Sequence, residues 1–441
     1  MPKEGEAVST VAAKPQSLGE LIQYYRQKKE LSLSKLQEAV GIDKGSLSRI
    51  ENSEVKRPDF QSILSIAAVL DIPHDAIVEQ YIEIGHKSEV IYAILQNELT
   101  TLEYPSLITK IAAKFLESPN EDSLDAVEKL YHTVDSIDHA PTQLSLFNLI
   151  VNYSRAHGIM PYIAKGLYRK YMIERNDFSR LKETYQSGKY ILDYADFLND
   201  SEKITINYSL AVHAYSLMLY DDSIKFSEYV IKHDKGKYKP YAINNIIFCY
   251  YNLKRFEESE QYLEEYKKFD LPCVIENSPL FEAFISEKTG NINLCLNQLS
   301  EYLKHSSEYN LVYVVSELFS LHIQANDPGT ALQLLDYEEK MVKSLQDIRT
   351  TPDKRAKLAD FYQLAGNILL QQSAERAFDY YLKSFAEYLK IGLYEKAFES
   401  ITFINQAIIG DSSLLDIELV KKINSMYMQA INKKIRKGWY T

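Results

Sequence analysis

The sequence is poor in the residues that interrupt regular structure. Its 441 residues include only 15 Gly and 13 Pro, which is low against average usage. The alternation of apolar and polar residues that marks half-buried strands is scarce, and apolar residues recur at intervals of three and four instead. The sequence therefore predicts a chain that is nearly all helix.

Cysteine and long apolar runs are also rare. The three cysteines, Cys249, Cys273 and Cys295, are widely spaced and lack metal-ligand spacing. No apolar run approaches the roughly 20 residues that span a bilayer, and residues 1–16 hold no stretch suited to a signal peptide. We therefore expect a cytoplasmic protein with reduced thiols and no membrane partner, preceded by a disordered tail at residues 1–16.

The sequence also lacks the signatures of catalytic and cofactor sites. GxxxxGK[ST], GxGxxG, HExxH and GxSxG do not occur, and the nine His are scattered without metal spacing. The sequence therefore predicts no enzyme, no cofactor and no metal site.

Charge is distributed unevenly along the chain. With 50 Lys and Arg against 61 Asp and Glu, the net charge is −11. Residues 14–60 have a balance of +2, which leaves −13 for the remainder. Such an asymmetry points to a nucleic-acid-binding segment, but +2 is a weak signal by itself and the argument depends on the motif.

Residues 17–80 have the pattern of a small domain of short helices. Helix N-caps are expected at Ser17, Ser32, Asp43 and Asp59. Gly41 supplies a tight turn, because a residue without Cβ can take positive φ. In the helix that follows Asp43, the apolar residues Leu47 and Ile50 face inward, so its polar and basic residues face outward.

The stretch from Leu18 to Val78, which includes "SRIEN" (48–52), resembles the phage-repressor (Xre) type of helix-turn-helix domain without a gap. The resemblance implies that the helix after Asp43 reads base edges in the major groove and that the residues following it contact phosphates. It also implies a structural ion pair between Arg26 and Glu51. The implied DNA-binding residues are Lys44, Gly45, Ser46, Ser48, Arg49, Asn52, Lys56 and Arg57. The alternative is a helix-turn-helix retained as a fold that no longer binds DNA.

A repeat with a period of 36 residues occupies the second half of the chain. Similar segments such as "YDDSIKFSEYV" and "FEESEQYLEEY" place small residues 36 apart, and a fifth small residue follows after 46. These residues are Ser223, Ser259, Cys295, Ala331 and Ala377. A small residue lets the two helices of a hairpin approach, and hairpins must stack to bury their apolar faces. The pattern resembles tetratricopeptide repeats.

In tetratricopeptide arrays the first helix of each hairpin lines the concave face. Counting back from the small residues gives inward positions rich in Tyr, Phe and Asn. Such a groove suits an extended peptide, because aromatic rings supply rigid apolar area and Asn side chains bond both N–H and C=O. The alternative is that these aromatic residues form the hairpin core. The candidate peptide-binding residues are Tyr208, Val212, Tyr215, Tyr241, Asn244, Phe248, Tyr251, Asn252, Phe284 and Glu287.

An Xre-type domain joined to a long repeat array resembles the layout of the Rap-Rgg-NprR-PlcR-PrgX peptide-pheromone receptors, and the NprR-like members most of all. The expected fold class is all-α. We expect a five-helix helix-turn-helix domain at 17–80 and a right-handed tetratricopeptide superhelix with a C-terminal capping helix at 81–441.

The resemblance implies a homodimeric transcription factor that binds a double-stranded DNA operator with inverted-repeat symmetry and is regulated by a short imported signalling peptide. Two alternatives stay open. One is a repeat scaffold that binds a protein partner such as a response regulator. The other is a constitutive repressor of a phage or mobile element whose array only dimerises.

Overall fold

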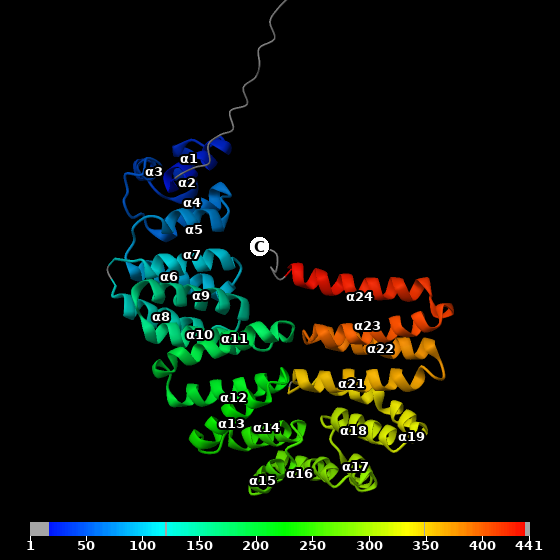
Figure 1. The fold of residues 1–441 in the computed structure, drawn as a ribbon. Helices are drawn as coiled ribbons and strands as arrows, with labels where there is room; N and C mark the ends of the chain where they lie inside the picture. Colours follow the sequence, from blue (N-terminus) through cyan, green and yellow to red (C-terminus); the bar gives the residue numbers. More distant parts are fainter. Residues whose placement is uncertain (1–16, 120, 348, 437–441) are drawn as a thin grey trace, which may run out of the picture. The chain divides into compact units, whose positions relative to one another are not determined.

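The computed structural model describes residues 17–119, 121–347 and 349–436, and all regular elements within these ranges are helices (Figure 1). The expected tail at residues 1–16 lies outside them. Contacts divide the chain into two compact units, one ending at Lys170 and one beginning at Tyr171. None of the helices in the described ranges is both long and apolar enough to cross a membrane.

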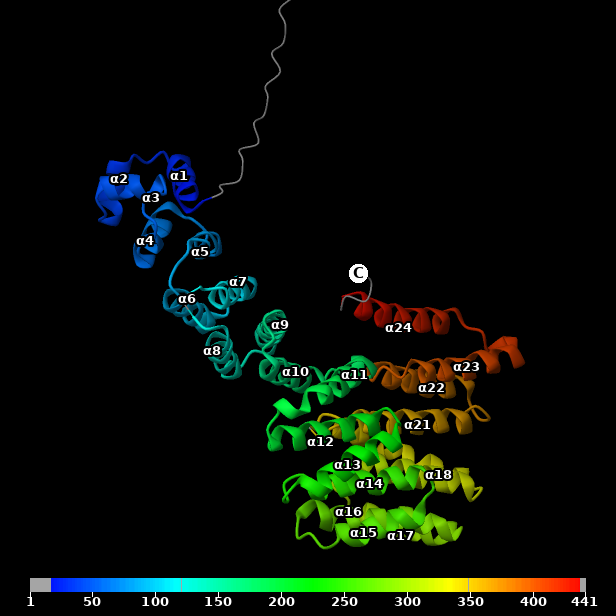
Figure 2. The same ribbon diagram turned by 60° about the vertical axis from the view of Figure 1, so that its left-hand side comes forward.

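The first five helices form a small bundle (Figure 2). They are α1 (Leu18–Lys28), α2 (Leu33–Val40), α3 (Lys44–Glu51), α4 (Phe60–Leu70) and α5 (His74–Ile82). All four expected N-caps accept a hydrogen bond from the backbone of the third residue after them. Gly41 lies between α2 and α3 at φ 73°, as its turn requires. The core consists of fully buried aliphatic side chains, among them Leu36, Leu47, Ile63 and Ile66.

The rest of the first unit continues as helical hairpins. α6 (Ser88–Thr101) packs on α7 (Pro105–Leu116), and α8 (Ser123–Asp135) packs on α9 (Ala140–His157). α10 (Met160–Glu174) contains the boundary between the units.

The second unit is a stack of hairpins, which are green to red in Figure 1. Its helices are α11 (Leu181–Ile191), α12 (Asp200–Ser216), α13 (Tyr220–His233), α14 (Lys239–Asn252), α15 (Phe256–Tyr266), α16 (Pro272–Ile285), α17 (Ile292–His305), α18 (Leu311–Gln324), α19 (Pro328–Gln333), α20 (Glu338–Ser344), α21 (Pro352–Leu369), α22 (Ala374–Lys390), α23 (Tyr394–Gly410) and α24 (Ile417–Arg436). Short 3₁₀ turns extend several of these helices.

The small residues of the 36-residue period hold these hairpins together. All five are at most 2% exposed. Ser223 Oγ donates to the carbonyl of Ala211 at 2.8 Å, and Ser259 Oγ donates to that of Ile247 at 3.0 Å, so the same bond recurs in successive repeats. The expected fold class, an all-α chain with an N-terminal helix-turn-helix followed by helical repeats, is confirmed.

Residues far apart in sequence meet where the array closes on itself. Leu181 at the start of α11 packs in one apolar cluster with residues of α21, α22 and α23, and α12 contacts α21. We call this cluster the closing seam; its buried members are Leu181, Ala356, Ala359, Phe385, Tyr388, Ile391 and Ala397. At the C-terminal end, Ile423 and Met426 of α24 pack against the array.

Candidate nucleic-acid interface and repeat groove

An ion pair fixes α3 against α1. Arg26 Nε lies 2.6 Å from Glu51 Oε1 and Nη2 lies 2.8 Å from Oε2, while Nη1 donates to the carbonyl of Leu31 at 2.8 Å. The two charged side chains are 13% and 4% exposed. The hydrogen bonds to Glu51 raise the pKa of Arg26. The ion pair expected from the resemblance is therefore confirmed.

Two contacts that the residue pattern did not predict set the position of α3. A Cβ on Gly19 would lie 2.3 Å from the carbonyl oxygen of Glu51, so only glycine lets α1 approach the end of α3 this closely. At the other end, Gln37 Oε1 on α2 accepts from the backbone N–H of Lys44 at 2.8 Å. Both ends of the candidate recognition helix are thus held by neighbouring helices.

The outward face of α3 is open. Lys44, Gly45 and Arg49 are exposed, and Ser46 and Ser48 are half-buried. Within the described residues, neither the ammonium group of Lys44 nor the guanidinium group of Arg49 forms a hydrogen bond or an ion pair. The hydroxyl of Ser48 accepts a long bond, 3.5 Å, from Asn52 Nδ2. Two cations therefore face outward from α3, Lys44 at its start and Arg49 in its last turn, with short polar groups between them.

The loop between α3 and α4 holds the other two candidate residues. Lys56 and Arg57 are both exposed. Arg57 differs from Lys56 because its Nε donates to the carbonyl of Gly85 at 2.7 Å. Of the expected phosphate contacts, Arg57 is therefore tethered to the chain beyond α5.

The candidate peptide-binding residues lie on the first helices of three successive hairpins, α12, α14 and α16, apart from Glu287 in the 3₁₀ turn after α16. Tyr208 stacks on Tyr238 with ring centroids 4.8 Å apart, and Tyr241 is 45% exposed. Tyr251 and Phe284 stack on one another at 5.3 Å and are buried. The group is therefore divided between open positions and positions packed inside the array.

Several of these side chains bond directly to one another. Asn252 Nδ2 donates to the hydroxyl of Tyr215 at 3.3 Å. The hydroxyl of Tyr251 donates to Glu287 at 2.8 Å, and Glu287 also pairs with Lys254 at 3.0 Å. These groups are already partnered within the protein.

Side-chain amides form a ladder across three repeats. Asn277 Nδ2 on α16 donates to Asn244 Oδ1 on α14 at 3.2 Å, and Asn310 Nδ2 donates to Asn277 Oδ1 at 2.9 Å. The sequence carries a signal for this ladder in the equal spacing of 33 residues. We call Asn244, Asn277 and Asn310 the amide ladder.

Residues of later repeats contact the candidate residues, and the residue pattern did not predict these contacts. The ring of Tyr313 on α18 lies 6.0 Å from Phe248, and its hydroxyl donates to Asp353 Oδ2 on α21 at 2.8 Å. Burial raises the pKa of Tyr313 and also that of Asp353. Contacts between hairpins therefore already involve Phe248, one of the candidate residues.

Val212, another candidate, lines a cavity of about 150 Å³ beside α12. Arg175 lines it too: its Nη1 donates to Ser209 Oγ at 2.9 Å, whereas its buried Nε has no partner among the described residues. Other polar residues in the wall are Asn176, His213, Ser216, Arg349, Thr350 and Thr351. An unpaired guanidinium N–H in a small cavity favours an anionic group there.

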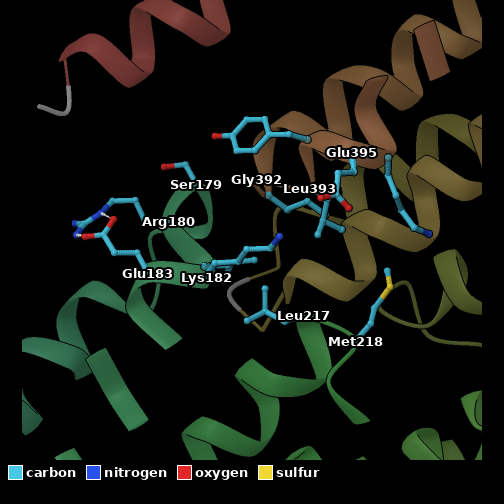
Figure 3. A pocket seen from close by; sticks show the side chains of 13 residues that line it. Ser179, Arg180, Lys182, Glu183, Leu217, Met218, Gly392, Leu393 and Glu395 are labelled. Carbon is cyan, nitrogen blue, oxygen red and sulfur yellow. Dashed lines mark hydrogen bonds and ion pairs between the residues drawn. The ribbon is translucent and has the colours of Figure 1, made fainter. Parts of the chain in front are cut away.

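A larger pocket, about 420 Å³, adjoins the closing seam (Figure 3). Leu217 and Met218 of the turn after α12 line it, together with Gly392 and Leu393 of the turn before α23. Arg180 at its rim is already paired with Glu183, with Nε–Oε2 at 2.9 Å.

Comparison with known proteins bears on the N-terminal domain. Residues 22–77 match the family described as "Helix-turn-helix". The chain is 35% identical over 63 residues, 14% of its length, to the HTH-type transcriptional regulator SinR of Bacillus subtilis (strain 168). It is 40% identical over 55 residues, 12% of its length, to SinR of Bacillus licheniformis. The matches cover 57% and 50% of these relatives, so the chain spans about half the length of the curated relatives it matches.

Solved structures with low identity were also found. A tetratricopeptide repeat protein from Parabacteroides merdae ATCC 43184 is 17% identical, with a TM-score of 0.43 and coverage of 62% of this chain and 97% of that one. Bacillus thuringiensis PlcR in complex with the peptide PapR7 and DNA is 15% identical, with a TM-score of 0.27 and coverage of 86% and 98%. Residues 22–77 are thus a helix-turn-helix domain, and the chain joins this domain to helical repeats.

Proposed function

We propose that the protein is a cytoplasmic, homodimeric transcriptional regulator that binds operator DNA through α3 and a short signalling peptide through the inner face of its repeats. The observation that carries the DNA-binding part is the open, cationic face of α3. Lys44 and Arg49 are exposed and unpaired within the described residues, while the buried pair of Arg26 and Glu51 holds the helix that presents them.

Each group has a role that fits its chemistry. Arg49 presents a guanidinium that can bond a guanine edge with two hydrogen bonds, which is worth about 1–3 kcal/mol of discrimination. Asn52, Lys56 and Arg57 contact phosphates and fix the register without reading sequence. In a homodimer, two copies of α3 would meet half-sites about 34–36 Å apart, which is why we expect an inverted repeat.

The peptide would bind to the inner face and replace some of the contacts that side chains there now make with one another. The Nδ2 group of Asn244 ends the amide ladder and offers a donor to a peptide carbonyl. Tyr241 is exposed beside it. Arg175, with its unpaired Nε, would receive a carboxylate of the peptide. Bonds such as that from Tyr313 to Asp353 would be lost or kept according to the side chains of the peptide.

This exchange supplies the allosteric coupling. A peptide that replaces contacts between hairpins binds one packing of the array better than another, and the dimer geometry would follow that packing. A difference of about 1–3 kcal/mol between the two states changes DNA affinity by about 5- to 150-fold. The protein would then act in quorum sensing as a peptide-pheromone receptor.

The DNA-binding part is tested by titrating the full-length protein with the promoter region of its own gene. We expect Arg49→Ala to abolish specific binding while the helical content stays unchanged. Arg155→Ala is the matched control, because it removes an exposed arginine from α9 outside the domain. Equal affinity of the wild type and Arg49→Ala would contradict the assignment of α3.

The peptide-binding part is tested by repeating the titration with synthetic peptides encoded by short reading frames next to the gene. We expect one peptide to shift the DNA affinity, and Asn244→Ala to weaken that peptide's binding without changing DNA binding in its absence. Asn293→Ala, an exposed asparagine on α17, is the control. Tight DNA binding that no peptide alters would favour a constitutive repressor. A stable complex with a folded response regulator, and no peptide effect, would favour the protein-partner alternative.

A further inference from the structure

The connection between α5 and α6 contacts the loop that joins α3 to α4. Arg57 in that loop donates from Nε to the carbonyl of Gly85 at 2.7 Å. Gly85 lies after the end of α5 and outside the residues 22–77 that match the helix-turn-helix family. This contact therefore ties a group on the DNA-binding surface to a part of the chain that does not belong to the matched domain.

A second hydrogen bond ties the same loop to α5. The hydroxyl of Tyr81, which is 2% exposed, donates to the carbonyl of Pro58 at 2.9 Å. The ring of Tyr81 also packs on Phe60 with centroids 4.7 Å apart. Pro58 follows Arg57 directly, so this bond holds the backbone next to Arg57 against the last turn of α5. The side chain of Arg57 is held separately by Gly85.

His86, which follows Gly85 directly, is anchored on Tyr81 of α5. Its ring is 6% exposed and stacks on Tyr81 with centroids 4.1 Å apart and an interplanar angle of 20°. Its Nε2 donates to the backbone carbonyl of Tyr81 at 3.1 Å. Burial lowers the pKa of His86, and the charge of Arg57 lowers it further, so the ring is neutral at pH 7. A buried, bonded residue immediately after Gly85 leaves the carbonyl of Gly85 little freedom.

We propose that the α5–α6 connection positions Arg57 for DNA. With Nε held by Gly85, both Nη groups of the exposed side chain have no partner among the described residues, and such a fork can bond a phosphate with two parallel bonds. Lys56, the neighbouring cation, has no such tether within the described residues. Arg57 is therefore a positioned phosphate contact and Lys56 a mobile one. This inference rests on the proposed DNA-binding function.

The arrangement gives the rest of the chain a way to alter DNA binding without moving α3. α6 begins at Ser88, two residues after His86. A displacement of α6 from α5 would withdraw the Gly85 carbonyl and free the Arg57 guanidinium. DNA affinity would then fall because the side chain must be ordered at the moment of binding.

A double-mutant cycle tests the proposal, because the buried His86 can affect DNA binding only through Arg57 or through the stability of the domain. A DNA duplex is first selected from a random library by the wild-type protein. Dissociation constants for that duplex are then measured for the wild type, His86→Ala, Arg57→Lys and the double variant. Arg57→Lys keeps the charge but removes the Nε donor. We expect His86→Ala to weaken binding about threefold to tenfold in the wild-type background and less than about twofold in the Arg57→Lys background.

Two controls separate positioning from damage to the fold. In the Lys56→Gln background, His86→Ala should retain its full effect, because Lys56 does not depend on Gly85. Tyr81→Phe removes only the bond to Pro58, so it should also weaken DNA binding more in the wild-type background than in the Arg57→Lys background, but by less than His86→Ala does. This second variant tests the proposal if His86→Ala does not fold. An equal loss in the wild-type and Arg57→Lys backgrounds would overturn the proposal, since His86 would then support the domain as a whole.

The salt dependence gives an independent readout. Arg57→Gln should reduce the slope of log affinity against log salt by about 1, as the loss of one phosphate contact requires. His86→Ala should leave that slope unchanged while lowering the affinity. A wild-type protein that selects no duplex would refute the proposed function and this inference with it, whereas normal selection with additive losses would refute the inference alone.

Discussion

The guanidinium of Arg26 and the carboxylate of Glu51 meet in two parallel hydrogen bonds, 2.6 Å and 2.8 Å long, with Glu51 only 4% exposed. Removing one partner leaves the other charge buried, which costs about 3–5 kcal/mol. We expect Glu51→Ala to lose that much stability in the N-terminal bundle and Arg26→Lys to lose less. Hydrogen exchange of the amides of α1 and α3 in the full-length protein measures the loss. Unchanged exchange in Glu51→Ala would show that the pair contributes nothing.

Two glycines of the first unit should respond oppositely to the same substitution. A Cβ on Gly19 would meet the carbonyl of Glu51 at 2.3 Å, whereas a Cβ on Gly85 would have no atom within 4 Å. We expect Gly19→Ala to force α1 away from α3, to destabilise the bundle by about 2 kcal/mol or more and to weaken DNA binding. Gly85→Ala should be neutral or stabilising by up to about 1 kcal/mol. Thermal unfolding of both variants, followed by circular dichroism, makes the comparison; similar melting curves would contradict it.

Ser53 ends α3 in a conformation that suits glycine. Its φ is 56°, and the N–H of Glu54 donates to the carbonyl of Arg49 at 2.8 Å, which is the pattern of a Schellman motif. A side chain in the left-handed region costs about 1 kcal/mol. We therefore expect Ser53→Gly to stabilise the bundle by about 0.5–1 kcal/mol, and Ser53→Val to destabilise it. Hydrogen exchange of α3 distinguishes the two; no gain in Ser53→Gly would mean that its greater freedom in the unfolded chain cancels the relief.

His213 gives the repeat array a dependence on pH. Its Nε2 donates to the carbonyl of Leu181 at 2.8 Å, its Nδ1 accepts from Tyr171 at 3.2 Å, and burial lowers its pKa to about 4. The unfolded chain, with an ordinary His pKa near 6.5, takes up the proton first as the pH falls. The contribution of the neutral ring is therefore complete above about pH 6.5 and lost as the pH falls towards 4, a change of order 3 kcal/mol.

The measurement compares the wild type with His213→Gln. The variant should be less stable than the wild type at pH 7, because it loses packing and hydrogen bonds, and this deficit should shrink between pH 6.5 and pH 4.5. His305→Gln, at a residue whose side chain is 81% exposed, is the control and should follow the wild type. A deficit that stays constant with pH would show that His213 does not titrate differently on folding.

Local signals in the sequence predicted local structure well. The four helix caps and the turn at Gly41 each depend on residues within one or two turns of helix, and the burial of Ser223 and its equivalents was predicted from the 36-residue period. The ion pair of Arg26 with Glu51 spans 25 positions, and it was predicted from the family resemblance and not from spacing. Periodicity also gave the first helix of each hairpin, from which the inward positions were counted.

Contacts between distant elements could not be predicted in this way. The bond from Tyr313 to Asp353 depends on how tightly successive hairpins wind around the array axis. The residues of a single hairpin do not determine this winding. The bond from Arg57 to Gly85 could not be predicted either, because its acceptor is a backbone carbonyl. Every residue has such a group, so the sequence does not single out Gly85. The roles of the candidate DNA-binding and peptide-binding residues stay predictions.

The closing seam changes how the repeat domain should unfold. In an open array each hairpin touches only its neighbours, so the ends fray first and melting spreads inward. Here Leu181 packs with Ile391 and Ala397, more than 200 residues away in sequence, so a helix near the start of the second unit is joined to helices near its end. Loss of the first hairpin must also expose the last, and the domain should melt in one cooperative step. The same long-range contacts raise the contact order, so the domain should fold more slowly than an open array of its length.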